Sequence, residues 1–173
     1  MVDRRKWIET DVDKQLLRLT ADCIDDEVAV AKVFQCLINF SLDKSWIERL
    51  IELNVSRRVF EYLMHSVKPS SSSIRTANAE IVRIKQTEEG GEFEIYEIKE
   101  GQANSIQASV MLLSNIAITE SGQQHILGID KKTRGAILEN LVGMFTYFRT
   151  SEMFDFVANI MSNVSSLKEG RCW

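Results

Sequence analysis

Apolar residues recur with helical spacing in three stretches of the chain, each centred on an asparagine: Asn39, Asn115 or Asn163. The positions nine, five and two residues before each asparagine, and the one after it, are apolar in every stretch. Steps of four, three and three residues place them on one face of an α-helix. The pattern predicts three helices of about 15 residues that bury the same stripe. The stripe residues are Val30, Phe34, Leu37 and Phe40; Ile106, Val110, Leu113 and Ile116; and Phe154, Ala158, Met161 and Val164.

The sequence that follows each asparagine repeats as well. Residues 45–51 align without gaps on 121–127, and residues 58–64 align on 136–142 after a short insertion. Each unit therefore consists of a long helix, a short helix and a further helix. Such a unit cannot bury its apolar stripe alone, so neighbouring units must stack. The sequence predicts an all-α fold, an armadillo-like right-handed superhelix of stacked helical repeats.

Local signals mark several helix ends. Ser121 and Gln124 fit a capping box at the start of the second short helix, and Thr150-Ser151 can cap the last long helix. Gly128 suits the end of the second short helix. These residues fix the expected helix boundaries.

A segment between Val67 and Gln102 makes the first repeat longer than the usual length of about 40 to 47 residues. It begins with Pro69 and a serine run over 70–73, a composition typical of linkers. Alternating apolar residues follow over 81–84 and 93–98, separated by a glycine turn at 88–91. We expect residues 67–102 to form a linker and β-hairpin inserted into a single domain that spans 1–173.

Composition excludes several classes of protein. The 173 residues include one proline and eight glycines, which favours helices over a turn-rich β-fold. The net charge of −4 argues against a nucleic-acid partner. No stretch is long and apolar enough for a signal peptide or a membrane span. Cys23, Cys36 and Cys172 lack metal-ligand or redox spacing, and their odd number favours reduced thiols, hence the cytoplasm or nucleus.

Motifs for catalysis are absent from the sequence. It contains no glycine-rich phosphate loop, no HExxH, no cysteine or histidine metal spacing and no nucleophile elbow. Each aligned repeat carries one histidine, His65 or His125, and the two do not suggest a paired site. We expect no enzymatic activity, no cofactor and no bound metal.

Several segments of the chain carry a family resemblance. Residues 113–122 resemble the third helix and following turn of armadillo repeats, and residues 43–54 resemble the first helix of the next unit. The order of residues 110–115, 138–142 and 162–171 is similar to that in the Hgh family. Those armadillo-like proteins are cytosolic adaptors in the folding of translation elongation factor 2 by the ring-shaped chaperonin. The resemblance implies a scaffold that binds these proteins; the alternative is an armadillo module that binds an extended peptide in transport or signalling.

The resemblance also implies contact residues. In peptide-binding armadillo proteins, an asparagine of the third helix lines the groove and hydrogen-bonds the backbone of the peptide. The corresponding residues are Asn39, Asn115 and Asn163, with Gln35, Met111 and Asn159 one helical turn earlier. Alternatively, each asparagine bonds loop carbonyls at the end of its own helix.

Trp46 stands where the other units have Gly122 and Gly170. Tryptophan dominates interface hot spots, so Trp46 is a candidate anchor for a partner. The alternative is that it packs against the neighbouring repeat or the hairpin.

The end of the chain matches the beginning of a short helix, because residues 167–173 correspond to the segment that starts at Thr119. An unfinished repeat leaves an apolar edge. We expect either a longer protein, of which this is the N-terminal part, or an edge covered by a partner chain, including a second copy. The oligomeric state stays open.

Overall fold

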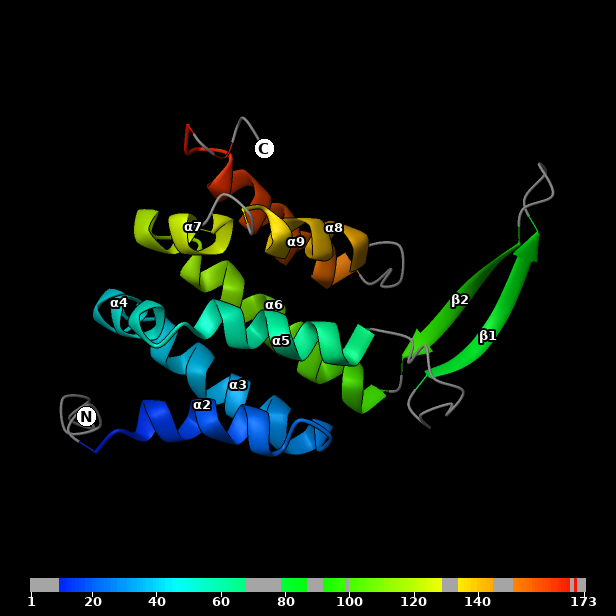
Figure 1. The fold of residues 1–173 in the computed structure, drawn as a ribbon, viewed down its shortest axis with the longest axis horizontal. Coiled ribbons are helices and arrows are strands. Elements are labelled where there is room, and N and C mark those ends of the chain that lie inside the picture. Colours follow the sequence, from blue (N-terminus) through cyan, green and yellow to red (C-terminus); the bar gives the residue numbers. More distant parts are fainter. Residues whose placement is uncertain are drawn as a thin grey trace.

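The chain is predominantly helical in the computed structural model, in agreement with the predicted all-α class (Figure 1). The structure describes residues 10–67, 79–86, 92–98, 100–128, 134–144, 151–168 and 170. The helices are α2 (Val12–Asp22), α3 (Glu27–Ser41), α4 (Lys44–Glu52), α5 (Val55–Val67), α6 (Glu100–Ile116), α7 (Glu120–Leu127), α8 (Ala136–Met144) and α9 (Ser151–Val164).

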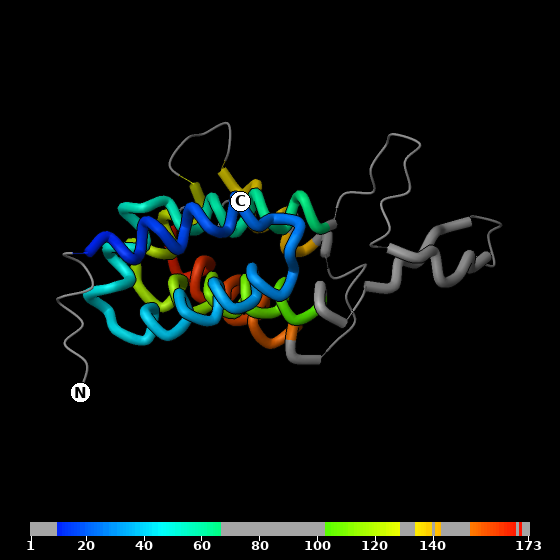
Figure 2. The backbone as a smooth tube through the Cα atoms, turned by 90° about the horizontal axis from the view of Figure 1, so that it is seen from below, coloured from blue at the N-terminus to red at the C-terminus, as the bar shows by residue number. Residues whose placement is uncertain are grey.

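The helices form two layers, which are separated in Figure 2. In one layer α3 packs against α6, and α6 packs against α9. In the other layer α2 packs against α5, and α5 packs against α8. The short helices α4 and α7 also pack against each other. Equivalent helices of the units predicted from the sequence are therefore neighbours in space.

The hydrophobic core lies between these layers. Phe34 of α3 meets Tyr62 of α5 edge to face, with the ring centroids 5.2 Å apart. The Tyr62 hydroxyl hydrogen-bonds the Ser105 hydroxyl of α6. Burial raises the pKa of Tyr62 above its ordinary value. One buried tyrosine thus joins three helices, and its polar end has a partner, as a buried hydroxyl requires.

Side-chain caps begin several of the helices. The Asp26 carboxylate accepts a hydrogen bond from the Ala29 N–H at the start of α3 (3.0 Å). The N-cap of α7 is Thr119, whose hydroxyl accepts from the Gly122 N–H (3.1 Å). The predicted capping box at Ser121 is therefore wrong, because Ser121 lies inside the first turn. Gly128 ends α7 with a φ of 91°, as predicted, whereas Thr150 lies outside the described residues.

The predicted apolar stripe is buried along the whole of α3 and α6. On α9 the prediction is wrong at two positions: Phe154 is 41% exposed and Ala158 is exposed, although Val164 is buried. The cause is that α9 is the last long helix in the described part of the chain. No further helix of that part covers the side of α9 that faces away from α6.

Two strands lie between α5 and α6 in the sequence. β1 (Ala79–Gln86) pairs with β2 (Glu92–Ile98) in an antiparallel two-stranded sheet. The register shifts between Ile81 and Arg83. In Figure 1 the two strands project away from the helical layers. The predicted serine-rich linker and glycine turn lie outside the described residues.

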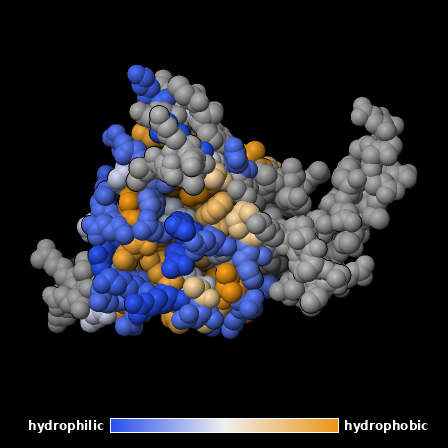
Figure 3. Space-filling model, in the orientation of Figure 1, coloured by the Kyte–Doolittle hydropathy of each residue, from blue (hydrophilic) through white to orange (hydrophobic). Residues whose placement is uncertain are grey.

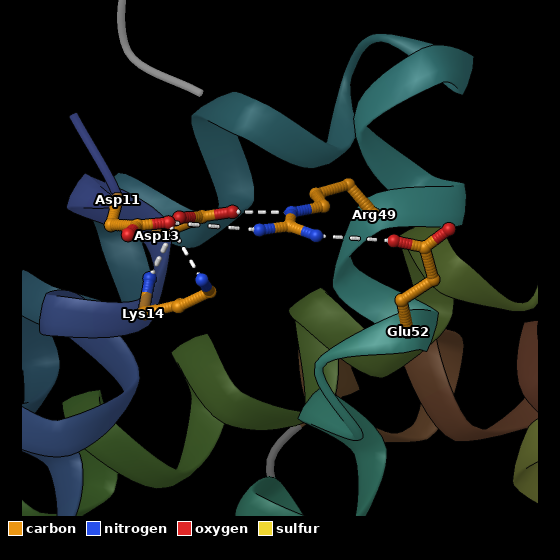
Figure 4. A network of polar contacts seen from close by, with 5 residues as sticks. All are labelled: Asp11, Asp13, Lys14, Arg49 and Glu52. Atoms are coloured by element: carbon orange, nitrogen blue, oxygen red, sulfur yellow. Dashed lines mark hydrogen bonds and ion pairs between the residues drawn. The ribbon is translucent and has the colours of Figure 1, made fainter. Parts of the chain in front are cut away.

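An ion-pair network fastens α2 to α4 (Figure 4). The Arg49 guanidinium of α4 donates from Nε to the Asp13 carboxylate (2.8 Å) and from Nη1 to Glu52 (3.2 Å). These hydrogen bonds raise the pKa of Arg49, that with Asp13 most strongly. Lys14 pairs with Asp11 at 2.8 Å, and the hydrogen bond from Lys14 lowers the pKa of Asp11. Because the Asp13 side chain is fully buried, its pairing with Arg49 holds α2 against α4.

The outer surface is mainly polar on the side shown in Figure 3, where apolar residues appear in scattered groups. None of the helices in the described ranges is long and apolar enough to span a bilayer.

Candidate protein-binding surface

Six of the seven candidate contact residues from the sequence lie on α3, α6 and α9, on the side of each helix opposite its buried stripe; the seventh, Trp46, lies on α4. These six residues are separated from the buried stripe by about half a turn around the helix axis. Because the three helices lie side by side, the residues form one surface that crosses three units. We call it the asparagine face, and it comprises Gln35, Asn39, Met111, Asn115, Asn159 and Asn163.

Exposure differs along the asparagine face. Gln35 and Asn39 on α3 are exposed, and so is Asn159 on α9. Met111, Asn115 and Asn163 are partly buried. The structure thus brings together all the candidates predicted from the repeat except Trp46, and the amides of α3 are the most accessible to a partner.

Asn115 has a structural role between units. Its side-chain Nδ2 donates a hydrogen bond to the Ser41 hydroxyl at the end of α3 (2.9 Å). Ser41 is buried, and its own hydroxyl donates to the Ile38 carbonyl (2.7 Å). This arrangement differs from the local loop bond that was one alternative for the asparagines. It links α6 to α3, so replacing Asn115 would disturb the stacking as well as the surface.

Trp46 is a correction to the predicted contact set. The indole is 2% exposed and stacks on the ring of Phe40, with centroids 4.5 Å apart and planes 11° apart. A partner cannot reach it in this structure. Of the two alternatives, packing is the one observed, and it joins α4 to the end of α3. We therefore remove Trp46 from the candidate surface.

Two exposed apolar residues beside the asparagine face were not predicted from the sequence. Leu42 is 70% exposed and Ile118 is 60% exposed. Each follows its asparagine by three residues, Asn39 or Asn115, so the two occupy equivalent places at the ends of α3 and α6. The repeat alignment contains this signal, because both positions are large and apolar where an exposed residue is expected. They give the surface an apolar border.

Groups with catalytic or metal-binding chemistry are not gathered at this surface. Across the described ranges, no three His, Cys, Asp or Glu residues are close enough to hold a metal ion. His65 lies on α5, with Nε2 3.7 Å from an Asp25 carboxylate oxygen. His125 lies on α7, where burial lowers its pKa. The asparagine face offers amide and apolar contacts, which suit binding.

Comparison of the chain with protein-family models, curated proteins and solved structures found no match. Function is therefore inferred from the geometry of the surface and from the residues that form it.

Proposed function

We propose that this protein is a non-catalytic, cytoplasmic protein-binding scaffold that contacts its partner through the asparagine face. The proposal includes the finer fold, an armadillo-like right-handed superhelix that carries β1 and β2 as an insertion. From the resemblance to the Hgh family, the partners are translation elongation factor 2 and the cytosolic chaperonin. The main support is that three adjacent long helices present amides at equivalent positions. Binding would then be spread over several units.

The chemistry of the face favours a polypeptide partner. An amide side chain both donates and accepts hydrogen bonds, as the polypeptide backbone does. Gln35 and Asn39 are uncharged, so covering them costs less than covering ions. Leu42 and Ile118 add apolar area next to the amides. A partly folded client offers both complements, namely backbone groups and apolar side chains.

The alternative proposal is an armadillo module that reads one extended peptide in transport or signalling. The recurrence of asparagine at the same place in three units favours it, since a regular ladder of amides matches a regular backbone. The two proposals differ in how binding depends on single amides. A peptide would lose most of its affinity with a few amides, whereas a broad client surface would lose little.

The test is capture from cytosol by the full chain, immobilised at one end, with immunodetection of elongation factor 2 and chaperonin subunits. The variant is the pair Gln35→Arg and Asn39→Arg, because both side chains are exposed and their replacement leaves the core intact. The matched control is Gln15→Arg, an exposed position on α2 in the other layer. Asn115 is left unchanged, since its bond to Ser41 supports the stack.

Recovery of both partners by the wild-type chain and the control, with reduced recovery by the paired variant, supports the adaptor at this face. Equal recovery by all three chains would place binding elsewhere. If neither partner is recovered, the adaptor proposal is wrong. Nearly complete loss of a defined peptide ligand in the paired variant would favour the alternative.

A further inference from the structure

Burial separates two lateral sides of the long helices. The residues five and one positions before each asparagine are Phe34 and Ile38 on α3, and Val110 and Ser114 on α6. All four are at most 7% exposed. Because α3 is followed by α6, and α6 by α9, this side faces the next unit. We call it the following side.

The residue three positions before each asparagine lies on the opposite lateral side of its helix, and its burial changes in the opposite direction along the stack. Leu112 on α6 and Ile160 on α9 are completely buried. Cys36, their counterpart on α3, is exposed. In the described part of the chain, α2 precedes α3 but lies in the other layer, so no helix of the α3 layer covers this side of α3, which explains the difference. We call this side the preceding side, and each internal interface joins the following side of one helix to the preceding side of the next.

On α9 the following side is open. Ala158 and Ser162 are exposed, although their counterparts on α3 and α6 are buried. In the other layer, Val142 of α8 is 43% exposed. At the opposite end of the stack, Leu19 of α2 is 43% exposed. The two ends of the described stack of helices therefore present the two halves of the interface that already repeats inside it.

We propose that this protein self-associates head to tail, with the following side of α9 bound to the preceding side of α3 in a second copy. The occupant is a second copy because the matching half of the repeated interface is present, and accessible, on the same chain. Such a contact is heterologous, so further copies can add in the same way. It uses lateral sides of the helices, not the asparagine face, and so goes beyond the proposed function.

The contact is expected to be weak. Ala158 and Ser162 are smaller or more polar than Phe34 and Ile38, which occupy the same positions on α3. Less apolar area is therefore buried between copies than between α3 and α6. Association should depend on concentration and appear between low micromolar and near-millimolar protein.

Sedimentation of the full chain over this concentration range provides the first test. We expect the mean mass to rise with concentration for the wild type, and to stay at that of one chain for Ala158→Glu. The matched control is Asn159→Glu, which adds the same charge one residue away, on the asparagine face. Both positions are exposed, so neither variant should unfold the helix. A constant monomer mass for the wild type, or equal loss in both variants, would overturn the proposal.

A disulfide trap tests the direction of the contact. The background carries Cys23→Ser and Cys172→Ser, so Cys36 is the only native thiol left. Adding Ser162→Cys should give linked dimers and longer chains under mild oxidation. Their loss after Cys36→Ser supports head-to-tail contact, and Asn159→Cys should link far less. Crosslinks that persist after Cys36→Ser would indicate a symmetric contact between two α9 helices and overturn the proposal.

Discussion

The short helices α4 and α7 hold the same place in successive units but are packed by different means. In α4, Trp46 fills the space against α3 by stacking on Phe40. In α7 the equivalent residue is Gly122, where an added Cβ would lie 1.9 Å from the Ile116 carbonyl oxygen. Gly170 repeats this close approach, with a Cβ 2.1 Å from the Val164 carbonyl oxygen. One place in the repeat thus accommodates either a large ring or no side chain.

The same two helices differ again three residues later. Arg49 of α4 reaches the buried Asp13 of α2, whereas the equivalent residue of α7 is His125. The Nε2 atom of His125 is buried, with no hydrogen-bond partner in the described part of the chain. The comparison shows that the repeat preserves the path of the backbone and the apolar stripe. Each unit satisfies the remaining contacts with its own residues.

Loss of the Trp46 ring from α4 should have the largest effect on the free energy of unfolding. Trp46→Ala removes a fully buried side chain and leaves a cavity beside Phe40, so unfolding should require about 3–5 kcal/mol less free energy. Urea denaturation of the two chains measures the difference. Trp46→Phe retains a ring and should lose clearly less. A loss below about 1 kcal/mol for Trp46→Ala would mean that the stacking contributes little.

Replacing Gly122 of α7 by alanine should have the next largest effect on the free energy of unfolding. Gly122→Ala places a methyl group against backbone, which cannot rotate away, and should destabilise the fold by about 1–3 kcal/mol. Alanine favours helices more than glycine, so an unconstrained site would be stabilised instead. The sign of the change in unfolding free energy, measured by urea denaturation, therefore shows whether the site is constrained. Gln124→Ala, at an exposed position of α7, is the control and should be nearly neutral.

Breaking the ion pair between Arg49 of α4 and Asp13 of α2 should have a smaller effect on the free energy of unfolding. Arg49→Met leaves the buried Asp13 carboxylate without its cation, at a cost of about 1–2 kcal/mol, reduced because the Arg49 side chain is 25% exposed. Arg57→Met is the control, since its ion pair with Glu61 is exposed and should matter by less than about 0.5 kcal/mol. If the buried charge of Asp13 causes the loss of stability, adding Asp13→Asn to Arg49→Met should recover part of that stability, as measured by thermal unfolding.

The pH dependence of His125 should give the smallest effect. Burial lowers its pKa in the folded chain, so the unfolded chain binds a proton more readily. Stability from this residue is present above the ordinary histidine pKa of about 6.5 and is lost as pH falls below it. The free energy of unfolding should therefore drop less between about pH 7.5 and 5.5 in His125→Gln than in the wild type. His65→Gln, at an exposed site, is the control, and identical pH profiles for the wild type and His125→Gln would contradict the assignment.

Much of the architecture could be predicted from local patterns. Helical spacing of apolar residues gave the spans of α3, α6 and α9, and Gly128 gave the end of α7. The cap of α7 was placed two residues late, because Thr119 and Ser121 both have hydroxyls and sequence alone does not show which N–H groups are free. For the candidate surface, the repeat alignment identified the asparagines. It did not reveal that Asn115 bonds Ser41, since that bond joins residues far apart in the chain.

The sequence by itself determined where the long helices α3, α6 and α9 lie and which stripe of each is apolar, because periodicity depends only on residues within a few turns; it did not predict α2. Tertiary structure alone decided which of those residues are covered. Phe34 and Ala158 share one position of the repeat, yet only Phe34 is buried, since α6 packs beside α3 and the structure describes no further long helix beyond α9. Trp46 became a core residue for the same reason: burial is a property of neighbours in space, which a repeat of the sequence does not specify.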